Sequence, residues 1–400
     1  MALRRLHSSY RAKSPAQTLA TAQTLMPRLG ISRVTDVTRM DRLGLPVCIS
    51  VRPRSATLRV HAGKGVDPLE ARVGALMEAI EYAAAEPANS TWQPRMLPAA
   101  ELAAQLGEGL RFVDLVPAQG ARIRASDTLA TVECEDLVQR RRVQVPAELV
   151  FVPYEPDGQQ RLFGSTTNGL ASGNSLVEAT LHGVLEVLER DALSMNRPRD
   201  ASRGVDNRRL PEPFRALASA WRGVGIELAV RAVPNACALP CFEAFLHEPA
   251  STSVNLAAGS GLHPDRDLAL ARAICEAAQS RLSHIHGGRD DITNFYAKYA
   301  RSGDGEAEAG VIGRLFDHGR QARYESLPHE PSAGRSLTGM LVMLLERMAK
   351  AGFGAAYRYR FRIDLNGLQV VKIVVPRCED ADSAPRRIGP RLWAQVLRRA

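Results

Sequence analysis

Apolar side chains return every three or four residues along five stretches of the chain. This period predicts helices that each bury one face, at residues 15–29, 68–86, 176–196, 268–286 and 337–351. Shorter apolar or β-branched runs predict strands at residues 45–51, 151–153, 226–232, 241–246 and 254–258. Residues 355–363 and 368–375 alternate apolar and polar positions around an Asn-Gly pair, which predicts a β-hairpin. The expected fold class is therefore α/β (α+β), with mixed or antiparallel sheets packed against helices.

The three strongest helical stretches share one internal repeat. Each copy begins with glycines, continues with a residue suited to capping a helix, and carries acidic or amide side chains further on. The copies read Gly63, Gly65, Asp67, Glu70, Glu78 and Glu81; Gly169, Gly173, Ser175, Glu178, Glu186 and Glu189; and Gly259, Gly261, Asp265, Leu268, Glu276 and Gln279. The last two positions fall at the same distance from the capping residue in every copy. The repeat predicts glycine turns that lead into capped helices, with capping boxes in the first two copies.

The repeated carboxylates share one side of each helix. At about 100° per residue, Glu178, Glu186 and Glu189 lie within roughly 80° of one another. The neighbouring positions are apolar, so each acidic stripe borders a buried face. Buried carboxylates require cations, and hard oxygen ligands that act together with phosphates suit Mg²⁺. Because helix starts also attract phosphate, the pattern indicates ATP bound with Mg²⁺.

Simpler interpretations stay open. Glutamates three residues apart commonly lie on a solvated face beside Lys or Arg, and Arg72, Arg190 and Arg272 are near enough in sequence to serve. A non-enzymatic docking protein with a degenerate nucleotide pocket is a second alternative. Lys64 lies between two glycines without the spacing of a P-loop. A Ser-His-Asp site has no support, because no Gly-x-Ser-x-Gly motif is present.

Composition limits the cellular environments and the binding partners that suit this protein. The chain has 400 residues, 45% of them hydrophobic, and Lys and Arg exceed Asp and Glu by 52 to 43. The surplus of +9 favours an acidic partner such as a polyphosphate or an acidic peptide, whereas arginines with few interleaved aromatics give nucleic-acid binding little support. No apolar run approaches the ~20 residues of a membrane span, and the six dispersed cysteines suit reduced thiols. We expect a cytoplasmic protein with neither nucleic-acid nor membrane partners.

Three motifs within the repeat resemble the YcaO family. They are Gly-Lys-Gly followed by Ala-Leu-Met-Glu-Ala-Ile-Glu (63–81), Asn-Gly-Leu-Ala-Ser-Gly-Asn followed by Glu-Val-Leu-Glu-Arg-Asp (168–191), and Ala-Arg-Ala-Ile-Cys-Glu-Ala-Ala-Gln-Ser-Arg (271–281). The resemblance extends over essentially the whole chain. It implies an α/β fold distinct from kinase and P-loop folds, in which glutamates hold ATP with Mg²⁺. It also implies an enzyme that phosphorylates a peptide-amide oxygen after nucleophilic attack.

The resemblance assigns roles residue by residue, without naming a catalytic side chain. It implies that the metal ligands are Glu78, Glu81, Glu178, Glu186, Glu189 and Glu276. It implies that the nucleotide is bound by Lys64, Asn174, Glu178, Arg190, Arg272, Gln279 and Arg281. Cations at such a site stabilise the charge that develops during phosphoryl transfer. We expect an N-terminal helical segment at 1–44 and a catalytic domain at 45–400, with a flexible insertion at 303–336.

Members of the family that the chain resembles make azolines, amidines or thioamides. Residues 43–81, with an Arg-Pro pair ahead of Gly-Lys-Gly, resemble members that work with a TfuA partner in peptide thioamidation. Cyclodehydratases of the family often end in Pro-x-Pro-x-Pro, and residues 388–393 here read Ile-Gly-Pro-Arg-Leu-Trp. We therefore expect thioamide formation on a peptide or protein, with a TfuA-like protein delivering sulfur. Cyclodehydration of Cys, Ser or Thr side chains is the alternative, and the resemblance is compatible with a homodimer.

Overall fold

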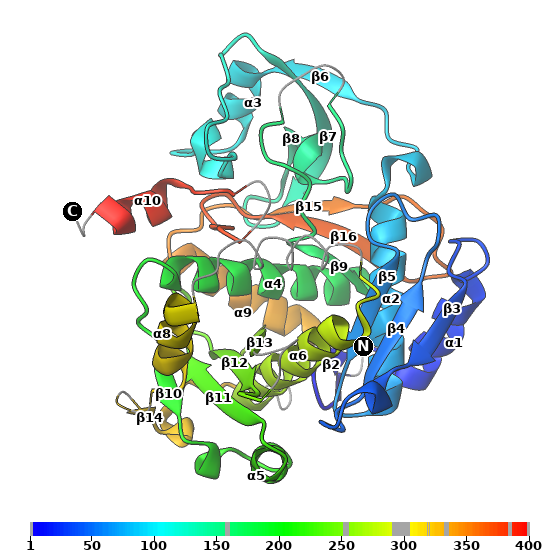
Figure 1. Cartoon of the computed structure of the whole chain (residues 1–400). Helices are drawn as coiled ribbons and strands as arrows, with labels where there is room; N and C mark the ends of the chain where they lie inside the picture. The colour runs from blue at the N-terminus through cyan, green and yellow to red at the C-terminus, as the bar shows by residue number, and fades with distance from the viewer. Residues whose placement is uncertain are drawn as a thin grey trace.

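The computed structural model describes residues 3–156, 161–250, 256–289, 305–317, 319, 321–331, 336–382 and 386–397. Its helices are α1 (Pro15–Leu25), α2 (Pro68–Ala85), α3 (Ala99–Gln105), α4 (Leu176–Asn196), α5 (Phe214–Gly223), α6 (Arg266–His286), α8 (Gly305–Leu315), α9 (Leu337–Lys350) and α10 (Pro390–Leu397). Its strands are β1 (Arg4–Arg5), β2 (Tyr10–Arg11), β3 (Arg33–Asp36), β4 (Val47–Val51), β5 (Val60–Lys64), β6 (Arg95–Pro98), β7 (Thr128–Asp136), β8 (Arg141–Pro146), β9 (Leu170–Gly173), β10 (Arg203–Val205), β11 (Glu227–Ala232), β12 (Cys241–His247), β13 (Leu256–Leu262), β14 (Gln321–Ala322), β15 (Tyr357–Arg360) and β16 (Gln369–Val374). Figure 1 shows their arrangement.

The described strands form a short hairpin, β1–β2, and larger sheets. β3, β4 and β5 make an antiparallel sheet. A second sheet runs β6-β7-β15-β16-β9, with β8 also paired to β7, and a third runs β13-β12-β11-β10-β14. The pairs are antiparallel except that between β10 and β14. Sheets of this kind packed with helices confirm the predicted fold class.

Each copy of the repeat folds as a strand followed by a helix that lies against it. The pairs are β5 with α2, β9 with α4, and β13 with α6. Asp67, Ser175 and Asp265 each accept a backbone N–H from the first turn of their helix, at 2.7, 3.2 and 3.0 Å. The expected capping boxes are wrong, because Glu70 and Glu178 instead bind residues near the N-terminus.

Most of the repeated glycines lie in strands that press on the helices, whereas Gly169 lies in the expected kind of turn, ahead of β9, with a φ of 79°. A Cβ atom on Gly63 in β5 would lie 2.1 Å from both Ala71 O and Ala75 N of α2. A Cβ on Gly259 in β13 would lie 2.1 Å from Ala277 N of α6. Only glycine lets two backbones come this close.

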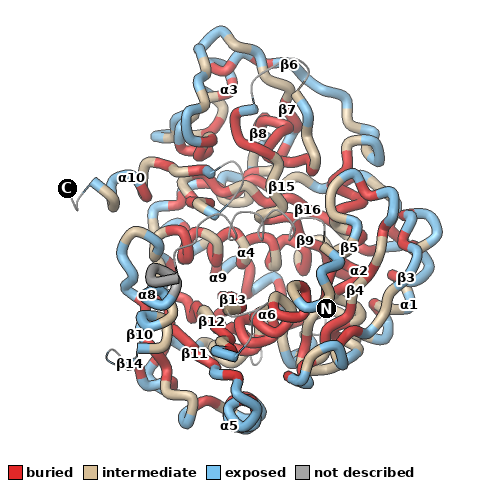
Figure 2. The backbone as a smooth tube through the Cα atoms, in the orientation of Figure 1, coloured by how far each residue is buried: buried red, intermediate tan, exposed pale blue. Residues whose placement is uncertain are grey.

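The helices meet these strands with small residues in matching register. Positions four, eight and twelve residues after the cap are Ala71, Ala75 and Ala79 in α2, Ala179, Gly183 and Val187 in α4, and Ala269, Ala273 and Ala277 in α6. Residues four apart share one helix face, and these positions are buried. Figure 2 shows the same helices as largely buried elements at the centre of the molecule.

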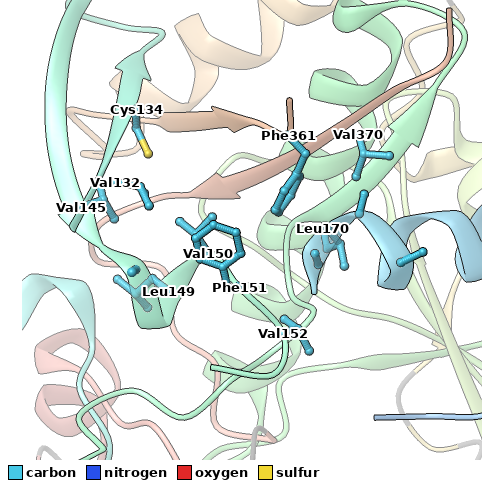
Figure 3. Close-up of a cluster of buried hydrophobic side chains, with 14 of the residues drawn as sticks. Val132, Cys134, Val145, Leu149, Val150, Phe151, Val152, Leu170, Phe361 and Val370 are labelled. Carbon is cyan, nitrogen blue, oxygen red and sulfur yellow. The ribbon is translucent and has the colours of Figure 1, made fainter. Parts of the chain in front are cut away.

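The apolar run at 151–153 is not the predicted strand. Phe151 and Val152 are buried, but they follow the short helical turn Ala147–Leu149 and belong to none of the described sheets. Figure 3 shows Phe151 among core side chains that include Val132 and Phe361. An apolar run shows that a segment is buried and leaves its backbone conformation open.

The other predicted elements are largely present. The helices α1, α2, α4, α6 and α9 confirm the predicted helices, with ends that differ by a few residues. The strands β4, β11 and β12 and the hairpin β15–β16 are confirmed, as is β13 where it overlaps the predicted strand; the first two residues of that strand, 254 and 255, lie outside the described residues. The strands β7 and β8, whose outward residues are charged, were not predicted.

The proposed division of the chain stays a prediction. β3, before residue 45, pairs with β4, after it, so the two parts share a sheet. Within the expected insertion, residues 303, 304, 318, 320 and 332–335 lie outside the described residues, and β14 pairs with β10. In the described ranges, no helix is long and apolar enough to cross a membrane.

The close strand–helix contact predicts a large effect of a single methyl group. In Gly63→Ala, the new Cβ would overlap helix backbone that has no rotamer to change, so we expect a loss of about 3 kcal/mol or more in the free energy of unfolding. Gly223→Ala, at the end of α5 with no neighbouring atom within 4 Å of the added Cβ, should change it by less than about 1 kcal/mol. Urea unfolding measures both, and equal effects would contradict the packing described.

Candidate functional site

A cavity of about 270 Å³ lies where the three repeated helices meet the N-terminal segment, residues 4–13. Residues from all three copies of the repeat line it, including Lys64, Glu78, Glu81, Asn174, Glu178, Glu186, Arg272 and Gln279. Each of these was predicted from the sequence as a metal or nucleotide ligand. Folding therefore brings distant parts of the chain together around one space.

Three glutamates of the cavity resist ionisation. Burial raises the pKa of Glu81 to about 8, and the nearby charges of Glu186 and Glu78 act in the same direction. Burial raises the pKa of Glu186 to about 7 even though Arg190 opposes the shift. Burial also raises the pKa of Glu78, which accepts a hydrogen bond from the Ala62 N–H at 2.6 Å. Full ionisation of this cluster requires additional positive charge.

Glu276 lies in the opposite electrostatic situation. Its Oε2 is 2.6 Å from Lys64 Nζ, and its Oε1 is 3.9 Å from the Arg190 guanidinium. Burial opposes ionisation, but Lys64 and Arg190 hold the pKa of Glu276 below its ordinary value. Cations are thus already present on this side of the site, and Glu276 and Arg190 stand beside the cavity without lining it.

Two other predicted ligands have their carboxylate oxygens occupied by protein donors. Glu189 accepts hydrogen bonds from Ser260 Oγ at 2.6 Å and Leu262 N at 2.9 Å, so it joins α4 to β13 outside the cavity lining. Glu178 lines the cavity but accepts from Ala12 N at 2.8 Å and from Asn174 Nδ2 at 3.1 Å. Both glutamates stabilise the arrangement of elements around the site.

Arg281 is not brought to the cavity. It is buried in an ion-pair network, 2.9 Å from Asp41 and 2.5 Å from Glu248. Two carboxylates already neutralise it here, so its role at a phosphate stays a prediction that this position does not favour. Arg272 is different: it lines the cavity, and its Nε is buried without a hydrogen-bond partner among the described residues.

The N-terminal segment closes one side of the cavity and was missed by sequence reasoning. Ser8, Ser9, Arg11 and Lys13 line the cavity. The segment also holds an acid at the start of each repeated helix, because Ser8 Oγ binds Glu70 at 2.7 Å. The remaining contacts join Arg11 to Glu178 at 3.2 Å and Arg5 to Asp265 at 3.2 Å. The only sequence signal was the basic composition of these residues.

This donor set fits a metal-bound polyphosphate. Glu78, Glu81 and Glu186 offer oxygen ligands whose raised pKa values fall when a divalent cation binds. Lys64 and Arg272 supply positive charge for phosphate oxygens in the same cavity. Hard oxygen ligands of this number suit Mg²⁺ better than zinc.

Comparison with known proteins agrees with this chemistry. A family model described as YcaO cyclodehydratase, ATP- and Mg²⁺-binding, matches residues 62–379. The chain belongs to the YcaO family. The expected family, ATP and Mg²⁺ as its cofactors, and the enzyme class are thereby confirmed at the level of the family.

Similar proteins extend along nearly the whole YcaO chain. An uncharacterized protein of Methanothermobacter thermautotrophicus is 30% identical over 405 residues, covering 96% of this chain and 99% of its own. A protein in the tfuA 3′ region of Rhizobium leguminosarum bv. trifolii is 30% identical, covering 92% of this chain and 88% of its own.

Solved structures share the fold. YcaO from Methanopyrus kandleri, bound with AMPPCP and Mg²⁺, matches with a TM-score of 0.74 and 26% identity, over 96% of this chain and 97% of its own. A heterocyclase in complex with substrate and cofactor matches with a TM-score of 0.78 and 20% identity, over 98% of this chain and 55% of its own. At that lower identity the second match speaks for the fold alone.

The carboxylate cluster predicts how stability depends on pH in metal-free protein. Glu81 and Glu186 have folded pKa values of about 8 and about 7, above their ordinary value, so the folded chain holds protons that the unfolded chain has lost. Their contribution to stability is present below pH 4.5 and is lost as the pH rises through 7 to 8.

We expect Tm to fall by about 2 °C or more between pH 6 and 8.5 in EDTA. Glu81→Gln should flatten this slope, and Mg²⁺ with ATP should oppose it. Differential scanning calorimetry provides the readout, and a wild-type slope retained in Glu81→Gln would contradict the assignment.

The same cluster predicts magnesium-dependent nucleotide binding. Glu186→Gln removes a carboxylate that can ionise and ligate Mg²⁺ when the metal binds, so Mg²⁺-dependent ATP affinity should fall by about 10- to 100-fold. Glu227→Gln, exposed on β11, is the matched control and should bind like the wild type. Isothermal titration calorimetry with and without Mg²⁺ measures both, and undiminished binding by Glu186→Gln would put the nucleotide elsewhere.

Proposed function

We propose that this chain uses ATP and Mg²⁺ to activate a peptide-backbone amide and installs a thioamide, with a TfuA-like protein delivering sulfur. The observation that carries the finer assignment is the Rhizobium leguminosarum relative from a tfuA region, which matches most of this chain. The resemblance of residues 43–81 to TfuA-associated members supports the same choice.

Site roles form part of this proposal. The metal is held by Glu78, Glu81 and Glu186. Their raised pKa values show that this buried carboxylate cluster has too few cations nearby to ionise fully. Lys64 and Arg272 bind phosphate oxygens. A wider set completes the site around them, namely Asn174, Glu178, Glu189, Arg190, Glu276 and Gln279.

The proposed reaction replaces the amide oxygen by sulfur without a change of oxidation state. Sulfide attacks the amide carbon, and the former carbonyl oxygen takes the terminal phosphoryl group of ATP while ADP leaves. The carbon–oxygen bond then breaks, so that the oxygen leaves in inorganic phosphate and a carbon–sulfur double bond remains. ATP supplies the activating phosphoryl group, while the cationic side chains stabilise charge on its oxygens and the N-terminal segment excludes water.

Cyclodehydration is the second candidate, favoured by the description of the matching family model. There a Cys, Ser or Thr side chain of the substrate is the nucleophile, and the same activation of the amide oxygen removes it as phosphate. The cavity chemistry is common to both reactions, so the nucleophile decides between them.

The setting of the enzyme belongs to the same proposal. We assign it to the cytoplasm, where its six free, buried cysteines would stay reduced. A homodimer stays a prediction.

A reconstituted reaction tests the proposal. The protein is incubated with ATP, Mg²⁺, sodium sulfide, a TfuA-like protein and candidate precursor peptides, and the peptides are analysed by mass spectrometry. We expect a gain in mass from sulfur replacing oxygen, dependent on sulfide and absent in Glu81→Gln.

Two other results would decide against thioamide formation. Loss of water without any need for sulfide would establish cyclodehydration. Unchanged peptide without ADP release, from protein that still binds ATP, would favour the docking-protein alternative.

A further inference from the structure

In the second sheet, β6 and β15 pair with different parts of β7 and leave a gap between them, which is called the fork below. β15 pairs with β7 only through Tyr357 and Arg358 in the described chain, although β16 covers its other edge along its full length. β6 pairs with β7 only as far as Thr131. Residues 132–134 of β7 pair with β8 on one edge, but the edge that β6 and β15 share has no described strand partner at these residues, nor has the end of β15.

Main-chain groups of β15 point into this fork. The Phe361 N–H donates to Val370 O at 3.1 Å, so Phe361 faces β16. In an antiparallel strand the flanking residues face the opposite edge. The N–H group of Arg360, the last residue of β15, is thus directed away from β16, toward the side where a strand could be added.

A groove of about 910 Å³ occupies the fork. It is near the upper end of the ~300–1,000 Å³ range of ligand pockets. Val132 and Glu133 of β7 and Tyr359 and Arg360 of β15 line it, so the unpaired edges are part of its wall. This groove is separate from the cavity that contains the glutamates.

The groove carries more positive than negative charge. Its lining holds five arginines, Arg95, Arg142, Arg358, Arg360 and Arg362, against three carboxylates, Glu133, Glu135 and Asp364. Arg358 is 2.6 Å from Glu135, and Arg142 is 3.6 Å from Glu133. Arg95, Arg360 and Arg362 are exposed and have no carboxylate within ion-pair distance among the described residues.

The walls of the groove are held in place by aromatic packing. Phe151 bridges the two branches, because its ring centroid is 4.8 Å from that of Trp92 and 5.8 Å from that of Tyr359. Trp92 Nε1 also donates to Thr131 O at 3.1 Å. These contacts fix the separation of the two branches of the fork, so the groove is preformed.

The groove ends beside the nucleotide cavity. Leu176, the first residue of α4, lines the groove, while Asn174 and Glu178 on either side of it in sequence line the cavity. Gln369, also in the groove, pairs with Gly173 at the end of β9. A peptide that lies along the groove therefore reaches the cavity over a short length of chain.

We propose that this groove binds an extended, acidic segment of the peptide substrate. The segment adds as a strand to the open edge of β15, and its carboxylates pair with Arg95, Arg360 and Arg362. The inference rests on the proposed function only in naming the bound peptide as the substrate. Single-stranded nucleic acid also suits arginines and aromatics, but it cannot form main-chain hydrogen bonds of the strand type with the open edge of β15 at Arg360.

Binding without chemistry tests this groove independently of the reaction. A fluorescein-labelled octapeptide of alternating Glu and Thr is titrated with the protein without ATP, and anisotropy is followed. We expect saturable binding that weakens with salt, and a loss of at least about tenfold in affinity for Arg360→Glu/Arg362→Glu. The same peptide N-methylated at alternate residues should bind more weakly, because it cannot complete the strand ladder.

Matched controls separate the groove from general charge and from catalysis. Arg39→Glu/Arg222→Glu reverses two exposed arginines that line neither cavity and should bind the peptide like the wild type. Unchanged Mg²⁺-dependent ATP binding in Arg360→Glu/Arg362→Glu would show that its fold is intact. Should that variant unfold, Arg360→Gln/Arg362→Gln serves in its place, with a smaller expected loss.

Three outcomes would overturn the proposal. They are no binding of the acidic peptide, equal binding after charge reversal, and tighter binding of a labelled thymidine decamer than of the peptide. None of them bears on thioamide formation, which the reconstituted reaction tests separately.

Discussion

Close contact between glycine-bearing strands and the helices that follow them determines where the functional side chains lie. The backbones of β5 and α2, and of β13 and α6, approach so closely that a Cβ on Gly63 or Gly259 would overlap helix main chain. On the helix side of this contact, small residues recur every four positions. This contact fixes the rotation of each helix about its own axis. The acidic stripe of the helix therefore faces in one defined direction. Repetition of this contact in three strand–helix pairs directs three stripes toward one region.

The same residue type then takes different roles according to its neighbours. Glu78, Glu81 and Glu186 share a cavity with too little positive charge, so their pKa values are raised. Glu276 has Lys64 beside it, and its pKa is lowered. Glutamates at the helix starts are held by the N-terminal segment instead. The site thus combines carboxylates that need a cation with cations available to an anion, as a metal-bound nucleotide requires.

Part of the excess of Lys and Arg over Asp and Glu in the chain is concentrated at the fork between β7 and β15. Arginines at alternate positions of β15 and just beyond it share one face of the strand. They line a groove that ends at the junction of β9 and α4, where the cavity lined by the glutamates begins. One short junction therefore lies between a surface suited to an extended acidic chain and a site suited to phosphoryl transfer.

The sequence by itself determined the long helices, the fold class and the family, and it pointed to most of the residues around one cavity, because helical periodicity and the repeated spacing of Glu78, Glu186 and Glu276 are local properties. It did not reveal that most of the repeated glycines lie in strands, since a glycine is equally compatible with a turn and with close packing. It gave no sign that Arg281 lies away from the cavity, because its partners Asp41 and Glu248 are distant in sequence. The tertiary structure alone decided the N-terminal wall of the cavity and the forked sheet, because both arise from contacts between segments that carry no shared local pattern.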